Sequence, residues 1–186
     1  MSDRSVEDEA VGAAPAEEGP LAVAAIATRV RSTFADVVVA RGEATVFVDR
    51  DALRDCLTWL RSDPELRFGF LSCVTATDHP GADPRIWLVN ELRSIERRHR
   101  VRVKVGLAEA DLHVPTVADL FPTADWQERE VYDFYGVIFD GHPDLTRILL
   151  PDDWEGFPLR KDEELGGVNT RYVGAFIPPI DKRGMA

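Results

Sequence analysis

Residues 100–107, RVRVKVGL, alternate between apolar and charged side chains without a break. The apolar residues are Val101, Val103 and Val105, and the basic residues are Arg100, Arg102 and Lys104. Because successive side chains point to opposite faces only in extended backbone, this pattern predicts a β-strand with one buried face and one charged face. Such a strand requires a sheet whose other strands present apolar residues to the same side.

Two segments that precede this strand predict its partners. Residues 67–76, RFGFLSCVTA, are expected to form a strand buried on both faces, and residues 85–92, RIWLVNEL, a second strand. Short polar turns separate the three segments, so we expect an antiparallel meander.

The region before these strands predicts a hairpin between two helices. Two β-branched runs flank Arg41-Gly42-Glu43, which is a hairpin pattern. An earlier helix is expected from Pro20, with Leu21, Ala24, Ala25, Thr28 and Phe34 at helical spacing. A later helix has an apolar stripe of Leu53, Cys56, Leu57 and Leu60, and either Asp49 or Asp51 is expected to cap it.

These elements predict an α+β domain of ferredoxin-like type, with a mixed or antiparallel sheet covered by helices on one face. We expect this domain to occupy residues 20–150. Residues 1–19 combine Glu, Ala, Gly and Pro and are expected to be a disordered acidic tail. Residues 151–186 are expected to be an extended, irregular C-terminal segment.

Charge argues against nucleic acid as a partner. The formal net charge is −11, whereas phosphate binding needs a cationic surface. A basic cluster does surround the alternating strand, but no aromatic platform is interleaved with it. The cluster comprises Arg93, Arg97, Arg98, Arg100, Arg102 and Lys104. The pattern favours a strand whose charges face solvent or a negatively charged protein partner, and it leaves that choice open.

The two cysteines, Cys56 and Cys73, lie in apolar contexts and have no CxxC partner. They indicate buried thiols in a reducing compartment, and they are too few to ligate an iron–sulfur cluster alone. The longest apolar run near the N-terminus, at 21–27, is too short to span a membrane and follows an acidic segment. We therefore expect a protein that is not inserted in a membrane.

Residues 128–162 hold the densest mixture of charge, aromatic rings, Gly and Pro in the chain. Just before them, residues 114–121 are expected to form one or two helical turns. Asp125 stands three residues before Glu128, a capping-box spacing that predicts a helix start, and Gly136 is placed to end the helix after Tyr135. Within this helix Arg129 and Asp133 are expected to pair at i,i+4. After it, residues 137–139 predict a short strand.

The same stretch raises a metal-site hypothesis. Glu130 and Asp133 share a helix face, and His142 could complete a site if the chain folded back across a turn. Glu128 is two residues from Glu130, hence about 200° around the helix, and cannot join them. A structural network of ion pairs is the alternative.

Beyond residue 150 the chain has no periodicity but carries Trp154, Phe157, Leu159, Tyr172 and Phe176. So many large apolar groups in an irregular segment favour ordering on the surface of another protein. Arg160, Lys161 and Asp162 would then be interface charges. Packing of the segment on its own domain is the alternative.

Three blocks carry a family resemblance: EREVYDFYG at 128–136, DGHPDLTRILL at 140–150 and GFPLRKD at 156–162. Together they resemble the signature of the 30-kDa subunit family, also called the C subunit, of respiratory NADH:quinone oxidoreductase (complex I). RVRVKVGL at 100–107 and VPTVADLFPTADWQERE at 114–130 also resemble the run that precedes that signature. The likeness covers about residues 30–165.

The resemblance implies a peripheral-arm subunit of a proton-translocating respiratory enzyme that has no active site, metal or cofactor of its own. FMN and iron–sulfur clusters would belong to partner subunits, and the C-terminal segment would lie on the D subunit near the B subunit. The location implied is the cytoplasmic side of the cell membrane. The residues carried over, with structural and interface roles, are Glu128, Arg129, Glu130, Asp133, His142, Arg147, Arg160, Lys161 and Asp162. Trp154, one of the large apolar groups of the C-terminal segment, is expected to share these structural and interface roles.

Two other hypotheses stay open at this point. One is the equivalent subunit of a related membrane-bound hydrogenase or of a quinone dehydrogenase with another electron donor. The other is a stand-alone metal-dependent enzyme that uses Glu130, Asp133 and His142.

Overall fold

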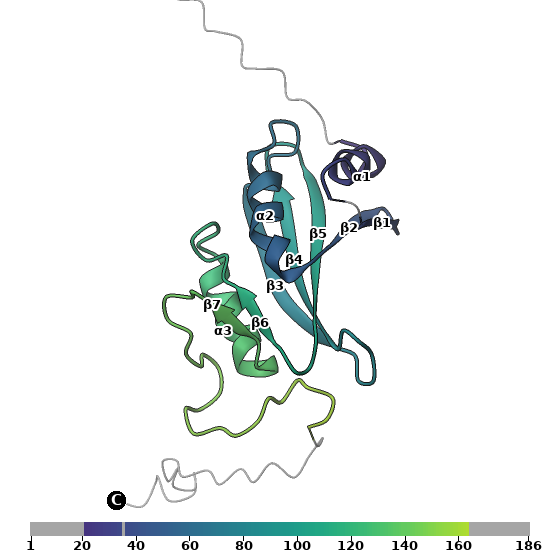
Figure 1. Cartoon of the computed structure of the whole chain (residues 1–186). Coiled ribbons are helices and arrows are strands. Elements are labelled where there is room, and N and C mark those ends of the chain that lie inside the picture. Colours follow the sequence, from purple (N-terminus) through teal and green to yellow (C-terminus); the bar gives the residue numbers. More distant parts are fainter. Residues whose placement is uncertain (1–20, 35, 164–186) are drawn as a thin grey trace, which may run out of the picture.

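The computed structural model describes residues 21–34 and 36–163. The predicted N-terminal tail, Pro20 and the end of the predicted C-terminal segment lie outside these residues. The elements in order are α1 (Val23–Arg31), β1 (Asp36–Ala40), β2 (Glu43–Val48), the 3₁₀ turn η1 (Arg50–Ala52), α2 (Leu53–Ser62), β3 (Phe70–Asp78), β4 (Ile86–Ser94), β5 (His99–Leu107), β6 (His113–Pro115), α3 (Ala124–Tyr135) and β7 (Ile138–Asp140). Figure 1 shows their arrangement.

Five strands form one mixed sheet in the order β1-β2-β5-β4-β3. The predicted meander is confirmed, because β4 pairs antiparallel with both β3 and β5. The predicted hairpin is also confirmed, with Arg41 and Gly42 between paired β1 and β2. The two units join through the parallel pair β2–β5, in which Val46 lies opposite Val103.

The alternating strand behaves as the sequence predicts. Val101, Val103 and Val105 are buried in the core cluster. On the other face Arg102 reaches Glu43, at 3.0 Å, and Glu91, and Arg100 reaches Glu43 at 2.5 Å. The basic residues of β5 are thus partly neutralised by carboxylates of the strands on either side.

Strand β3 corrects one expectation. It is an edge strand, with Leu71, Val74 and Ala76 buried and Thr75 exposed, so only one of its faces is buried throughout. Its outer edge is covered by α3, where Thr123 Oγ1 donates to the Leu71 carbonyl at 2.9 Å and the Gln127 carbonyl oxygen accepts from the Val74 amide. The apolar run at 67–76 therefore belongs to an edge strand that a helix protects. It does not belong to a strand buried between two layers.

The helices follow the predicted stripes unevenly. In α2 the predicted Leu53, Cys56, Leu57 and Leu60 are all buried, but neither Asp49 nor Asp51 makes a cap: Ala52 occupies the N-cap position. For the first helix the prediction was right only at its two ends, because Leu21 and Phe34, which flank α1, pack against the core. Within α1 the buried residues are Ile26, Ala27 and Val30, whereas the expected Ala24, Ala25 and Thr28 are exposed.

Helix α3 ends as predicted and begins differently. Gly136 has φ +74°, the left-handed conformation that favours glycine at a helix end. The predicted capping box is wrong, because the N-cap is Thr123 and Asp125 lies within the first turn. Residues 114–121, expected to form one or two helical turns, do so only in part. Val114 and Pro115 belong to β6, which pairs parallel with β7 in a small second sheet, whereas residues 117–121 form one turn in which the Leu120 and Phe121 amides donate to the Val117 carbonyl.

Candidate docking segment and its anchors

The side chain of Glu128 is buried in α3 and holds the connection that follows β6. Its carboxylate accepts hydrogen bonds from the Thr116 hydroxyl, at 2.5 Å, and from the Val117 amide, at 2.8 Å. Burial raises the pKa of Glu128 against the opposing effect of these hydrogen bonds. Glu128 therefore acts inside the domain as a tie between helix and loop.

His142 folds back onto the same helix, as the metal hypothesis required, but it meets different residues. Its buried Nε2 atom lies 3.3 Å from Oδ1 of Asp125 and 3.9 Å from Oε2 of Glu128. Nδ1 accepts the Asp144 amide, so Nε2 carries a proton and donates to the Asp125 carbonyl at 3.1 Å.

The predicted metal trio is therefore not assembled: Glu130 is exposed, and the Asp133 carboxylate is occupied by hydrogen bonds from elsewhere. Within residues 21–34 and 36–163, no group of three or more His, Cys, Asp or Glu side chains is arranged to hold a metal ion.

Asp133 organises the start of the C-terminal segment. Its buried carboxylate accepts hydrogen bonds from Arg147 at 2.8 Å and from the amides of Ile148, Leu149 and Leu150 at 3.2, 2.9 and 2.9 Å. Burial alone would raise the pKa of Asp133, but the amides and Arg147 outweigh it and hold that pKa below its usual value. The expected pairing of Asp133 with Arg129 is wrong.

Arg129 binds the same segment one turn earlier. Its guanidinium donates to the Thr146 carbonyl and hydroxyl, at 3.1 and 2.9 Å, and to the Arg147 carbonyl at 3.2 Å. It also lies 5.1 Å from the ring centroid of Trp126, within cation–π range. Arg147 in turn donates to the Trp154 carbonyl at 3.0 Å. The two arginines thus anchor residues 146–154 through backbone oxygens.

The end of α3 receives the next part of the chain. Arg160 donates to the Tyr135 carbonyl at 2.7 Å, and the Leu159 amide donates to the Phe134 carbonyl at 3.3 Å. Phe157 packs on Gly136 so closely that a Cβ atom there would lie 2.6 Å from its ring. The Arg160 guanidinium also lies over that ring, 4.6 Å from its centroid. Gly136 is required both for its φ and for this contact.

Asp78 and Arg85 anchor residues 161–162 to the β3–β4 hairpin. Asp78, whose side chain is 0% exposed, forms an ion pair with Arg85 at 2.8 Å and accepts the Lys161 amide at 2.7 Å. Arg85 also reaches Asp162 at 2.8 Å. Hydrogen bonding to Asp78 and Asp162 raises the pKa of Arg85 and lowers the pKa of both carboxyls. Lys161 contributes its backbone, and its side chain is exposed.

Residues 145–163, here named the anchored segment, therefore lie along α3 and the end of the β3–β4 hairpin, as the ribbon also shows (Figure 1). The sequence indicated most of the charged residues but not their partners. Asp78, Arg85 and Thr116 were missed, because they lie between 12 and 83 residues from the signature residues that they bind and have no motif around them. The backbone acceptors left no signal in the sequence either.

The outer side of this region carries apolar groups. Trp126, Leu149 and Leu159 are 62%, 61% and 41% exposed.

None of the helices in the described part of the chain is both long and apolar enough to cross a membrane.

Comparisons with known proteins agree with this picture. The family model described as "Respiratory-chain NADH dehydrogenase, 30 Kd subunit" matches residues 46–169. The C subunit of NADH-quinone oxidoreductase from Saccharopolyspora erythraea is 51% identical over 148 residues, which cover 79% of this chain and 59% of that protein. The corresponding C subunit from Acidothermus cellulolyticus is 49% identical over 146 residues, covering 78% and 76%. The chain spans about 60% of the length of the first curated relatives it matches.

Two solved structures share the fold. A trypsin-resistant fragment of Nqo5 is 27% identical with a TM-score of 0.60, covering 67% of this chain and all of the fragment. A chain of the membrane-bound sulfane sulfur reductase, an archaeal respiratory membrane complex, is 29% identical with a TM-score of 0.68, covering 86% of this chain and 97% of that chain. On the family match and the identity to its relatives, the chain belongs to the 30-kDa subunit family of respiratory-chain NADH dehydrogenase, the family of the C subunit of NADH-quinone oxidoreductase.

Proposed function

We propose that this chain is a structural subunit in the peripheral arm of a proton-translocating NADH:quinone oxidoreductase, and that it has no active site of its own. Electrons would pass from NADH to quinone through FMN and iron–sulfur clusters held by partner subunits. Family membership supports the assignment, as does the use of the signature residues as anchors.

The observation that carries the proposal is the anchoring of residues 145–163. Asp133, Arg129 and Arg160 bind backbone groups of the chain and fix its path, while Leu149 and Leu159 stay exposed. Exposed apolar side chains on a rigidly held segment are typical of a protein–protein interface. The nine signature residues and Trp154 therefore have structural and interface roles in this proposal.

The partners in this proposal are the D and B subunits, with the chain peripheral on the cytoplasmic side of the cell membrane. The docking part would comprise the outer side of the anchored segment and the residues that follow it, up to 186. We also propose that the fold is ferredoxin-like, with the helices on one face of the sheet. This assignment is supported by one buried cluster that joins α1, α2 and the valines of β5.

A second candidate is the equivalent subunit of a respiratory membrane complex with another electron donor. The likeness to a chain of the archaeal sulfane sulfur reductase complex favours it. The identity of about one half to relatives named as the C subunit of NADH-quinone oxidoreductase favours the first candidate.

Detergent extraction of the tagged full chain from its source cells tests both candidates. Co-purification with D and B subunits, flavin and NADH oxidation is expected. A complex that lacks NADH oxidation but reduces quinone from another donor would select the second candidate. An isolated monomer with no partner subunits would contradict both.

The docking role is tested by removing residues 164–186, which keeps every residue of the anchored segment. The truncated chain is expected to fold with an unchanged unfolding transition and to lose most of its co-purifying D and B subunits. Removal of residues 1–19 is the matched control, with no loss expected. Normal recovery of the complex with the C-terminal truncation would contradict the docking role of those residues.

A further inference from the structure

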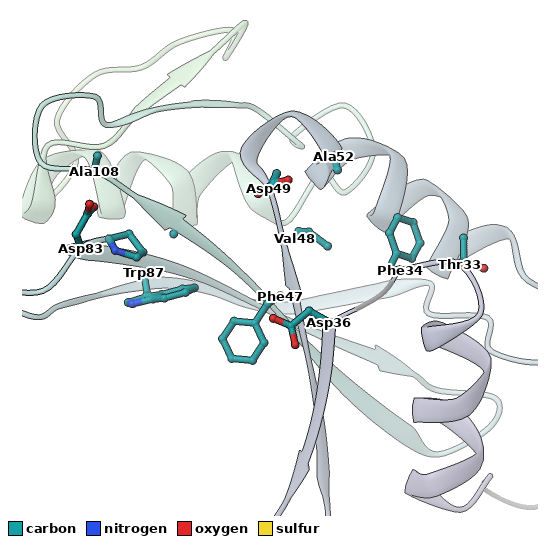
Figure 2. A pocket seen from close by; sticks show the side chains of 12 residues that line it. Thr33, Phe34, Asp36, Phe47, Val48, Asp49, Ala52, Asp83, Trp87 and Ala108 are labelled. Carbon is teal, nitrogen blue, oxygen red and sulfur yellow. The ribbon is translucent and has the colours of Figure 1, made fainter.

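A groove of about 710 Å³ lies away from the anchored segment and shares no lining residue with it. The residues that follow α1, the beginning of β1, the end of β2 and the β3–β4 loop surround it, with β5 at its base. Figure 2 shows it from close by. None of its lining residues belongs to the signature blocks, so the proposed docking role leaves it unexplained.

Two of the three aromatic residues that line the groove are in contact with each other. Phe47 of β2 and Trp87 of β4 make an edge-to-face contact, with ring centroids 5.5 Å apart and planes at 84°. Trp87 lies opposite Gly106 in the sheet register, and a Cβ atom at Gly106 would clash with Pro84 and lie 3.4 Å from the Trp87 ring. The absence of a side chain at Gly106 thus leaves room for Pro84 and Trp87. This close packing against Gly106 holds the indole on the open face of the sheet.

Three carboxylates line the groove. They belong to Asp36, Asp49 and Asp83, which are all exposed, and Figure 2 shows Asp36 and Asp83 on opposite sides of the two rings. None of the groove's twelve lining residues is basic. Lys104, the register partner of Phe47, lies on the same face of the sheet but does not line the groove.

Elsewhere on this face of the sheet, carboxylates are paired with basic residues. Glu43 and Glu91 are neutralised by Arg100 and Arg102. In the described part of the chain, by contrast, no hydrogen bond or ion pair involves the carboxylates of Asp36, Asp49 or Asp83. The groove therefore combines two mutually contacting aromatic rings and three carboxylates that make no hydrogen bond or ion pair within the described residues.

We propose that this groove binds a Lys or Arg side chain from a basic segment of a neighbouring subunit. An aromatic ring attracts a cation by its quadrupole, and carboxylates placed around the ring add charge-assisted hydrogen bonds. The groove is a second contact beyond the docking of the C-terminal segment. That the basic segment belongs to a neighbouring subunit rests on the proposed function. The preference of the groove for a cation does not rest on it.

The cation preference is tested on the ¹⁵N-labelled full chain with the peptide acetyl-Gly-Lys-Gly-Arg-Gly-amide. At low salt the indole N–H signal of Trp87 is expected to shift on titration, with Trp59 and Trp126 as internal references. The analogue with Glu in place of both basic residues is expected to leave Trp87 unmoved. Equal shifts with both peptides, or none with either, would overturn the proposal.

Matched variants locate the binding. Asp36→Asn with Asp83→Asn is expected to weaken peptide binding about fivefold, because two exposed charge contacts, each of modest strength, are lost. Asp55→Asn, which removes an exposed carboxylate on α2, is the control, with no change expected. Equal weakening by the control would mean general charge attraction and would overturn the groove as the site.

The intact complex provides the second arm. The chain with Asp36→Lys and Asp83→Lys is expected to dissociate from the extracted complex at a lower salt concentration than either wild type or Asp55→Lys. Unchanged salt resistance, or self-association of the isolated chain through this face on gel filtration, would overturn the neighbouring subunit as occupant. A wild-type chain that captures no subunit at all would instead contradict the proposed function, and the peptide result would stand.

Discussion

Oδ1 of Asp133 lies 2.8 Å from Nη1 of Arg147, while Oδ2 of the same carboxylate accepts three successive backbone amides. The helix thus supplies one fully used acceptor group around which the following loop turns. Because the Asp133 side chain is 0% exposed and that of Arg147 17%, the ion pair is shielded from water on the carboxylate side.

Asp133→Ala is expected to lower the free energy of unfolding by about 3–5 kcal/mol, the range for breaking a buried ion pair, because Arg147 and three amides lose their acceptor. Glu130→Ala, an exposed position one turn earlier in α3, is the control and is expected to stay within about 0.5 kcal/mol of wild type. Urea unfolding followed by circular dichroism gives both values. Equal effects at the two positions would contradict the anchoring role.

The lowered pKa of Asp133 also predicts a pH dependence. A carboxyl whose folded pKa is lowered stabilises the fold above its unfolded pKa, and this stability is lost as pH falls through the folded pKa. The difference in unfolding free energy between wild type and Asp133→Ala should therefore shrink as pH falls below the unfolded pKa of about 3.9. A difference that stays constant down to pH 2 would argue against this assignment.

Glu128 is expected to act with the opposite sign, because burial raises its pKa. Its contribution is fully present below the unfolded pKa and is lost as pH rises through the folded pKa. Glu128→Gln keeps an acceptor for Val117 without the buried charge, so it should compare more favourably with wild type at pH 7 than at pH 4. Unfolding free energies at the two pH values provide the test, and a reversed order would contradict it.

Gly136→Ala should destabilise the protein more than Gly42→Ala does. Both glycines have φ near +75°, but a Cβ at Gly42 meets nothing within 4 Å, whereas at Gly136 it meets Phe157 and Arg160. Gly42→Ala therefore measures backbone strain, about 1–2 kcal/mol. Gly136→Ala adds about 1–3 kcal/mol for displacing packed groups. Faster amide hydrogen exchange at Leu159 in Gly136→Ala alone would locate the effect, and equal destabilisation would refute it.

Cys56 should be chemically inert in the folded protein. Burial raises the pKa of its thiol to about 12, so almost no thiolate forms at pH 8. Iodoacetamide labelling read by mass spectrometry is expected to modify Cys56 only after urea is added. The half-buried Cys73 serves as the internal reference. Labelling of Cys56 in the native state as fast as in urea would contradict the prediction.

Residue spacing in the sequence predicted those elements for which local backbone preference and tertiary packing favour the same structure. The stripe of α2 and the alternation of β5 place their residues by backbone period, and the end of α3 follows from the left-handed φ that Gly136 adopts. The middle of the α1 face was missed because its alanines fit several helical registers. Packing against the β1–β2 hairpin then selected Ile26, Ala27 and Val30.

The candidate site was predictable in its residues but not in its contacts. Asp133 was expected to pair within its helix, yet a buried carboxylate is better satisfied by three amides and Arg147 than by one solvated neighbour. The metal-site hypothesis required His142 beside Glu130, but after the turn at Gly141 the imidazole lies near Asp125 and Glu128. Partners supplied by loops leave no period in the sequence.

The parallel pairing of β2 with β5 has a consequence for the order in which the chain folds. Thr45 lies opposite Arg102, so the N-terminal hairpin cannot complete the sheet until residues 99–107 have left the ribosome. The three antiparallel strands close through short loops and lose less loop entropy, so they are expected to form before the hairpin joins. During synthesis the edge of β2 that β5 later covers is therefore exposed, and this is the stage at which a chaperone or an early assembly partner has access to it.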